Sequence, residues 1–113
     1  LAEYQDLDGI IRSAISVVEG DLSYAWKVDD LACILAFSKR SLQRYFQQSE
    51  LNFSILLRAV RFQQASLRLA DPAFSITDIS YSCGFSDSAH FSRDFRKGVG
   101  ISPSAYRQIA LAA

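Results

Sequence analysis

Apolar residues recur every three or four positions along most of the chain, which is the spacing of helices that bury one face. The first predicted helix covers residues 5–18 and stops before Gly20. Its apolar positions are Leu7, Ile10, Ile11, Ala14, Ile15 and Val18. A short second helix is expected over residues 28–36, with Leu31, Ile34 and Leu35 facing inward. We find no strand or hairpin pattern, so the sequence predicts an all-helical protein.

A third helix is predicted after a tight turn at residues 36–38, with Ser38 as its cap and about Gln48 as its end. At about 100° per residue, Leu42 and Phe46 lie together on one side of this helix. Four polar residues spread over the opposite side: Arg40, Gln43, Arg44 and Gln47. The spacing therefore separates a buried face from a polar face that is available for contacts.

The longest predicted helix covers residues 53–70, and Asn52 can cap it. Asp71-Pro72 ends this helix, because proline biases the preceding residue away from helical geometry. Its inward stripe is predicted to be Phe53, Leu56, Leu57, Val60, Gln64 and Leu67. Its arginines, Arg58, Arg61 and Arg68, are expected to be solvated or bridging.

Three shorter helices are predicted in the last third of the chain. A capping-box-like sequence at residues 75–78 opens the fifth helix, and Gly84 follows its end, where a left-handed residue is favoured. Ser86 is expected to cap the sixth helix, which buries Phe91 and Phe95 and ends near residue 97. The last helix opens at residues 102–103, where a serine cap precedes a proline in the first turn.

Two segments of the chain repeat each other. Leu-Ala-x-x-Leu-Ala-Phe-Ser at residues 31–38 recurs as Ile-Ser-x-x-Cys-Gly-Phe-Ser at residues 79–86. After one additional residue, Leu-Gln-Arg-Tyr-Phe at 42–46 recurs as Phe-Ser-Arg-Asp-Phe at 91–95. Each copy is predicted to be a helix, a tight turn and a second helix, which is the order of a helix-turn-helix unit. The second helices carry an arginine at matching outward positions.

The charge distribution is uneven although the 113-residue chain has 12 basic and 12 acidic residues and no net charge. Residues 1–30 include seven acids and two bases, whereas residues 31–113 include ten bases and five acids. A phosphate backbone responds to the local field, so the basic part of the chain is compatible with a nucleic-acid partner.

Composition and length exclude several other classes. No apolar run approaches the roughly 20 residues of a membrane-spanning helix, and no signal peptide is recognisable. The chain starts at Leu1 and lacks methionine, so we expect a fragment of a longer cytoplasmic protein. The cysteines, Cys33 and Cys83, are expected to be free thiols. With one histidine, they form no ligand cluster, so neither a metal nor another cofactor is predicted.

The second copy and its surroundings resemble a known family. Residues 79–107, ISYSCGFSDSAHFSRDFRKGVGISPSAYR, are similar to the signature of the AraC/XylS transcription regulators. The specific parts are Gly84-Phe85-Ser86, Phe91-Ser92-Arg93, Phe95, Gly100-x-Ser102-Pro103 and Tyr106-Arg107. The first copy, with KRSLQRYF followed by FSILLRAVR, matches more loosely. Ala36 and Glu50 stand where members of the family usually have glycine, which puts the local backbone geometry in question.

The resemblance implies an all-α protein of about seven helices. Two homeodomain-like helix-turn-helix units, residues 1–52 and 71–113, would be joined by a long linker helix, residues 53–70. It further implies a nucleoid-associated regulator that binds double-stranded DNA sequence-specifically through two recognition helices in successive major grooves. RNA polymerase and an N-terminal sensor or dimerisation domain outside this fragment are further candidate partners.

The expected DNA contacts fall into two groups. Base contacts are expected where arginine can pair with guanine or glutamine with adenine, and at positions that match base readers of the family. These residues are Arg40, Gln43, Arg44, Ser88, Ala89, Ser92 and Arg93. Phosphate contacts are expected from residues that flank these faces or lie at helix N-termini. They are Ser38, Lys39, Ser86, His90, Arg96 and Lys97.

Two alternatives stand beside this reading. A helical protein-interaction module without DNA binding is compatible with the zero net charge and the acidic first 30 residues. An enzyme is disfavoured, because His90 lies on a helix face beside charges and no glycine elbow or oxyanion loop accompanies it. His90 is equally compatible with an ordinary surface histidine.

Overall fold

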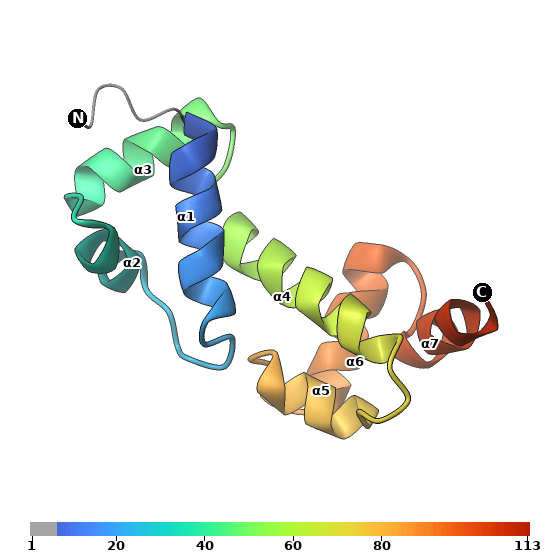
Figure 1. Ribbon diagram of the computed structural model, residues 1–113. Helices are drawn as coiled ribbons and strands as arrows, with labels where there is room; N and C mark the ends of the chain where they lie inside the picture. Colours follow the sequence, from blue (N-terminus) through green and yellow to red (C-terminus); the bar gives the residue numbers. More distant parts are fainter. Residues whose placement is uncertain (1–6) are drawn as a thin grey trace. The chain divides into compact units, whose positions relative to one another are not determined.

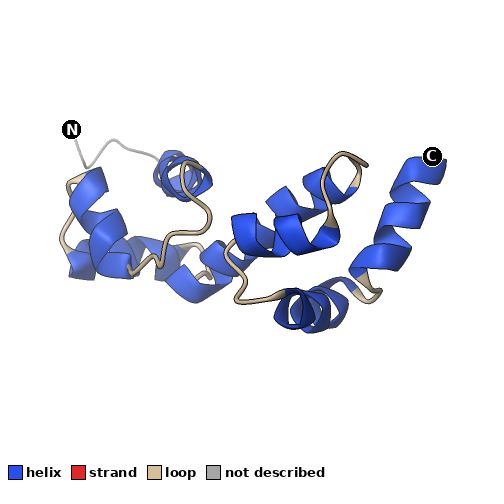
Figure 2. Cartoon of the chain, turned by 90° about the horizontal axis from the view of Figure 1, so that it is seen from below, coloured by secondary structure: helices blue, strands red, loops and turns tan. Residues whose placement is uncertain are grey.

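The computed structural model describes residues 7–113, which form seven α-helices and no strand (Figures 1 and 2). The helices are α1 (Leu7–Glu19), α2 (Val28–Leu35), α3 (Lys39–Gln48), α4 (Phe53–Leu69), α5 (Ile76–Ser82), α6 (Ser88–Val99) and α7 (Pro103–Ala112). The all-α prediction is confirmed, and every predicted helix is present with ends close to the expected ones. Residues 5 and 6 of the first predicted helix lie outside the described residues.

The chain divides into two compact units, the first ending at Val60 and the second starting at Arg61. The division falls inside α4, so this helix supplies its first half to one unit and its second half to the other. The three-part boundaries expected from the sequence stay a prediction.

The first unit packs α1, α2 and α3 against one another. Its buried apolar side chains are Ile10, Ala14, Val18, Leu22, Leu31, Ala32, Leu42, Phe46, Leu56 and Val60. The expected inward position of Ile34 is wrong, because this side chain is 58% exposed. In this helix of eight residues, Leu31 and Ala32 are buried, and Val28 and Leu35 are half-buried beside them. These four residues occupy positions i, i+3, i+4 and i+7, and Ile34 falls outside this stripe.

The second unit is built around a cluster of aromatic rings. Phe85 and Phe91 lie 4.9 Å apart, and Phe91 and Phe95 lie 5.5 Å apart, measured between ring centroids. Phe62 of α4 stacks on Phe85 at 6.0 Å and meets Phe95 edge-on at 6.1 Å. Tyr106 of α7 contacts Phe95 at 5.5 Å. These contacts hold α6 between the second half of α4 and α7, at geometries that aromatic pairs prefer.

The predicted inward stripe of α4 is wrong at Leu67, which is 63% exposed. Leu56 and Val60 in the first half of the helix are buried as predicted, whereas the buried positions of the second half are Ala65 and Leu69. The step of five between Val60 and Ala65 departs from the helical period at the unit boundary. A single continuous stripe was the wrong expectation, because the two halves of α4 contribute to two different cores.

None of the helices formed by residues 7–113 combines the length and the apolar character that crossing a membrane requires.

Candidate nucleic-acid interface

The turns that precede α3 and α6 have the same backbone geometry. Phe37 N donates a hydrogen bond to Ala32 O at 2.9 Å, and Phe85 N donates to Ser80 O at 2.8 Å. In each turn the residue before the phenylalanine is left-handed, with φ of 62° at Ala36 and 91° at Gly84. This is the hydrogen bond of a Schellman turn, which ends one helix and redirects the chain. The sequence repeat is therefore also a structural repeat.

Ala36 and Glu50 are the two non-glycine residues with positive φ in the described part of the chain, at 62° and 57°. They are also the two positions at which the sequence departs from the usual glycine. Beside Glu50, Leu51 N donates to Phe46 O at 2.8 Å, which closes a second turn of the same kind. The backbone thus keeps the left-handed conformation despite the side chains, at a cost of roughly 1–2 kcal/mol at each position.

The polar face of α3 forms a shallow cleft of about 330 Å³ lined by Arg40, Gln43, Arg44 and Gln47. The opposite face is anchored by Leu42 and Phe46, which are buried. Three of the four lining residues were predicted as base contacts. Gln47 was not among them, although the helical spacing had already placed it on this face.

Side-chain contacts involve Arg44 on this face and residues 38 and 39 at the start of the helix. The guanidinium carbon of Arg44 lies 5.4 Å from the centroid of the Tyr45 ring, a cation–π distance that limits the rotamers of the arginine. Lys39 Nζ lies 3.4 Å from Asp29 Oδ1, and both side chains are exposed. Ser38 Oγ accepts a hydrogen bond from Ser41 N at 3.0 Å, which confirms Ser38 as the cap of α3.

The cap of α6 is Asp87, so the expectation of Ser86 was wrong. Asp87 Oδ1 accepts from His90 N at 2.7 Å, and the helix begins at Ser88. The additional residue in the second copy of the repeat shifts the start of α6 by one position, and aspartate is as good a cap as serine. Ser86 has a different role, in the contacts of the His90 ring.

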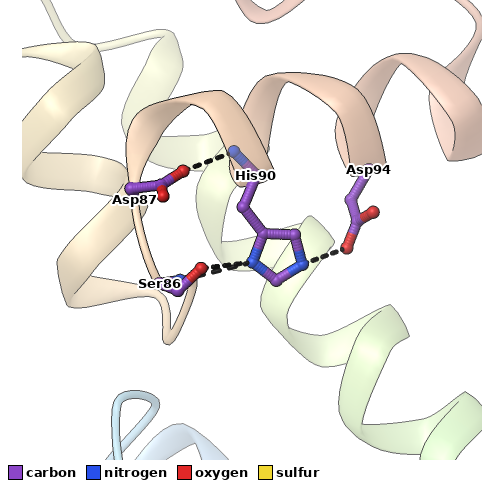
Figure 3. A network of polar contacts seen from close by, with 4 residues as sticks. All are labelled: Ser86, Asp87, His90 and Asp94. Atoms are coloured by element: carbon purple, nitrogen blue, oxygen red, sulfur yellow. Dashed lines mark hydrogen bonds and ion pairs between the residues drawn. The ribbon is translucent and has the colours of Figure 1, made fainter.

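Figure 3 shows the His90 ring between Ser86 and Asp94. Ser86 N donates to His90 Nδ1 at 3.3 Å, and Ser86 Oγ lies 2.9 Å from the same nitrogen. Because a backbone N–H can only donate, Nδ1 is the acceptor and the ring proton belongs on Nε2. Nε2 lies 3.0 Å from Asp94 Oδ2. Both ring nitrogens therefore have partners, and His90 joins the turn to the body of α6.

Of the predicted base-contact residues of α6, Ala89 and Arg93 lie on the side of the helix away from the buried Phe91 and Phe95. At about 100° per residue, Ser92 lies at the edge of that side, and Ser88 projects close to Phe95. Ala89 and Arg93 are exposed, and Ser88 and Ser92 are half-buried. Arg96 and Lys97 are exposed in the last turn, where positive charge complements the helix dipole. The structure thus gathers the α3 set in the first unit and the α6 set in the second.

Two arginines that sequence reasoning did not assign to DNA have structural contacts in the second unit. Arg68 Nη1 lies 2.8 Å from Cys83 Sγ and 3.5 Å from Ser82 Oγ, which agrees with its expected bridging role. Burial lowers the pKa of Arg61, and the nearby Cys83 opposes this shift.

Arg107 was known from the sequence only as part of the family signature. Its Nε donates to Leu69 O at 2.9 Å, and its Nη2 donates to Asp71 O at 3.3 Å and to Phe74 O. It therefore joins α7 to the carbonyls at the end of α4 and in the following loop. No spacing rule could have found this role, because the partners lie more than 30 residues away.

Cys33 and Cys83 are both free thiols, as predicted, and the structure adds that Cys33 is exposed and Cys83 is buried. Within residues 7–113, no three histidine, cysteine or acidic side chains come close enough together to hold a metal ion.

Two helix-turn-helix units, each with the polar face of its second helix exposed, define a double helix-turn-helix protein. A family model described as a helix-turn-helix domain matches residues 31–109. The chain is also similar to the solved structure of a transcriptional regulator with an AraC-type DNA-binding domain from Chromobacterium violaceum. The TM-score is 0.83 and the identity 29%, over 91% of this chain and 93% of the other. The chain belongs to the AraC/XylS family of transcription regulators.

Longer relatives give the same result. The chain is 33% identical to the Msm operon regulatory protein of Streptococcus mutans, over 87% of this chain and 36% of the relative. It is 29% identical to the HTH-type transcriptional activator CsvR of Escherichia coli, over 80% of this chain and 34% of the relative. The chain thus spans about a third of the length of the curated relatives it matches.

Proposed function

We propose that this chain is the sequence-specific, double-stranded-DNA-binding part of a transcription regulator, with α3 and α6 as its recognition helices. One observation carries the proposal: the two units share the same turn, bury equivalent apolar faces and expose an arginine at equivalent positions, Arg44 and Arg93. An α-helix fits the major groove of B-DNA, where base edges can be distinguished by their donors and acceptors. The names of the relatives as transcriptional regulators support this function.

Base recognition is assigned to the polar faces of the two helices. On α3, the forks of Arg40 and Arg44 suit guanine, and the amide of Gln43 suits adenine. On α6, Arg93 suits guanine, the hydroxyls of Ser88 and Ser92 can pair with several bases, and the methyl of Ala89 can contact thymine.

Phosphate contacts are assigned to side chains that flank these faces: Ser38, Lys39, Ser86, His90, Arg96 and Lys97. Such contacts fix the position of a protein on DNA without reading its sequence. For His90, a phosphate contact requires the release of Ser86 or Asp94, because each holds one of the ring nitrogens. Lys39 would similarly exchange Asp29 for a phosphate. Within residues 7–113, neither Arg96 nor Lys97 forms an ion pair that a phosphate would have to displace, so these two residues are the strongest assignments of this group.

The test compares two arginines of α6 in a selection of binding sites from random DNA. Arg93→Ala should cost about 1–3 kcal/mol in affinity for the preferred site and relax selection at one base position. Arg96→Ala should weaken all sites alike and reduce the slope of log K against log salt by about one. An unchanged selection profile for Arg93→Ala would refute the base contact.

A control in the first unit separates the two recognition helices. Arg44→Ala should relax a base position different from the one that Arg93 reads, because the two arginines lie on different recognition helices. If neither substitution altered selection and binding lacked salt dependence, the proposed function would be wrong as a whole.

The same proposal extends to the longer protein. We propose that this DNA-binding part works in the cytoplasm with a sensor or dimerisation domain in the same polypeptide, and that RNA polymerase is a further partner. Relatives about three times longer than the matched region support the first point. The same relatives, which are named as regulators, support a binding role rather than an enzymatic one.

A further inference from the structure

A second hollow in the first unit lies between the loop at residues 20–27 and the outer side of α2. Its volume is about 340 Å³, and we call it the acid-rimmed cleft. It is lined by Asp21, Tyr24, Trp26, Asp30, Cys33 and Ile34. It shares no residue with the cleft on the polar face of α3, so DNA recognition does not account for it.

The loop wall of this cleft is held in place by its own contacts. Trp26 Nε1 donates to Asp21 O at 2.7 Å, and the Tyr24 and Trp26 rings meet edge to face at 4.7 Å. Leu22 anchors the loop in the core, where it is 4% exposed. A preformed site loses less conformational entropy on binding than a mobile one, so this wall is suited to receive a ligand.

Apolar side chains of the cleft are open to solvent. Ile34 is 58% exposed and Tyr24 is 46% exposed, and Trp26 is half-buried beside them. Ile34 breaks the inward pattern that the rest of the α2 sequence follows. Clustered exposed apolar residues with aromatic members are typical of protein-binding surfaces.

The charge of the rim indicates the chemistry of the occupant. Asp21 and Asp30 each use one carboxylate oxygen inside the unit, Oδ1 with Ser23 Oγ at 3.3 Å and Oδ2 with Lys27 N at 2.9 Å. The second oxygen of each carboxylate can accept from a cation. An acidic rim repels the phosphates of DNA and attracts lysine or arginine.

From the charge of Asp21 and Asp30 and from the apolar side chains Ile34 and Trp26, we propose that the acid-rimmed cleft binds a segment of another protein. This segment carries an aliphatic or aromatic side chain next to a lysine or arginine. The apolar side chain packs against Ile34 and Trp26, and the cation pairs with Asp21 and Asp30. This contact is independent of DNA binding, so the chain can hold DNA and a protein through different surfaces of the first unit.

The test selects displayed random peptides of about 12 residues, a length that spans a groove of this kind, on the purified chain in the absence of DNA. Selected peptides should share an apolar residue followed or preceded by lysine or arginine. Affinity for the best peptide, measured by fluorescence anisotropy, should fall about tenfold or more with Ile34→Asp and by a smaller factor with Asp21→Asn. The matched control is Ile109→Asp in α7, because Ile109 is 63% exposed and lies outside the cleft.

The reactivity of Cys33 in the unsubstituted chain reports whether the peptide binds in the cleft. It lines the cleft and is exposed, whereas Cys83 is buried, so a maleimide should modify Cys33 selectively. Bound peptide should slow this modification several-fold. Failure to enrich any such peptide, equal losses with Ile34→Asp and Ile109→Asp, or unprotected Cys33 would each overturn the proposal. Because DNA is absent throughout, these results are independent of whether the chain binds DNA.

Discussion

At the scale of single residues, the left-handed positions of the two turns, Ala36 and Gly84, show that different residues can adopt the same backbone conformation. Ala36 and Gly84 occupy equivalent places and close the same hydrogen bond, but only the glycine adopts this conformation without steric cost. The turn of the first unit therefore carries backbone strain that the turn of the second unit lacks. Substituting each of the two residues by the other measures this strain as a change in the free energy of unfolding.

Ala36→Gly should stabilise the chain by about 0.5–1 kcal/mol, because relief of left-handed strain exceeds the entropy that glycine adds to the unfolded state. Gly84→Ala should destabilise it by about 1–2 kcal/mol. Urea denaturation would measure both changes. The control is Ala59→Gly at an exposed position of α4, where the same substitution in ordinary helical geometry should cost about 1 kcal/mol. Destabilisation by Ala36→Gly would contradict the left-handed assignment.

Arg107 is a second residue expected to contribute strongly to stability, because its guanidinium donates hydrogen bonds to three backbone carbonyls. Arg107→Lys should lower the free energy of unfolding by about 1–3 kcal/mol, since an ammonium cannot reach all three acceptors in the same geometry. Thermal or urea unfolding gives the value. The control Arg96→Lys, at an exposed position of α6, should leave stability nearly unchanged. Equal effects of the two substitutions would show that the hydrogen bonds of Arg107 do not contribute to stability.

At the scale of helices, the caps show how local chemistry sets the start of a recognition helix. Asp87→Ala should destabilise α6 by about 1 kcal/mol, whereas Asp87→Asn, which keeps an acceptor, should cost much less. Amide hydrogen exchange in the first turn of α6 would report the fraying directly. If Ser86→Ala caused the larger loss of protection, Asp87 would not be the cap.

Local features of the helices could be predicted from the sequence because they depend on neighbouring residues. Ser38, Asn52, Ser75 and Ser102 each accept a backbone hydrogen bond three residues ahead, as expected of caps. Ser86 was mistaken for a cap because two good capping residues are adjacent, and the choice between them depends on the length of the turn. Leu67 was misplaced because the phase of α4 depends on where one core ends and the next begins.

Contacts between distant residues could not be predicted in the same way. The partners of Arg107 and the stacking of Phe62 on Phe85 depend on how helices pack within the second unit. The polar faces of α3 and α6 were predictable, because helical spacing alone separates them from Leu42, Phe46, Phe91 and Phe95. The acid-rimmed cleft was not, because its wall is an irregular loop and its floor includes Ile34, which the pattern assigned to the core.

At the scale of the whole molecule, the zero net charge conceals surfaces with opposite preferences. The polar face of α3 carries Arg40 and Arg44, while Asp21 and Asp30 border the acid-rimmed cleft of the same unit. Net charge is therefore a poor guide to the partners of this chain, since each ligand responds to the field of the surface that it meets.

If both units bind one duplex in successive major grooves, a single chain should protect an asymmetric site of about 20 bp, two helical turns, from nuclease cleavage. A double substitution, Arg40→Ala with Arg44→Ala, should confine strong protection to the half of the site that α6 contacts. Wild-type protection of only one helical turn would show that the two units do not act together on DNA.

The left-handed backbone conformation of Ala36 has a consequence for recognising such proteins in genomes. A search pattern that demands glycine in the turn would detect the second unit and overlook the first, although both turns close the same hydrogen bond. A pattern built on the turn phenylalanine (Phe37 or Phe85) and on the buried small residue five positions before it (Ala32 or Ser80) would detect both copies. Proteins with two degenerate copies would otherwise be catalogued as having a single reader of DNA.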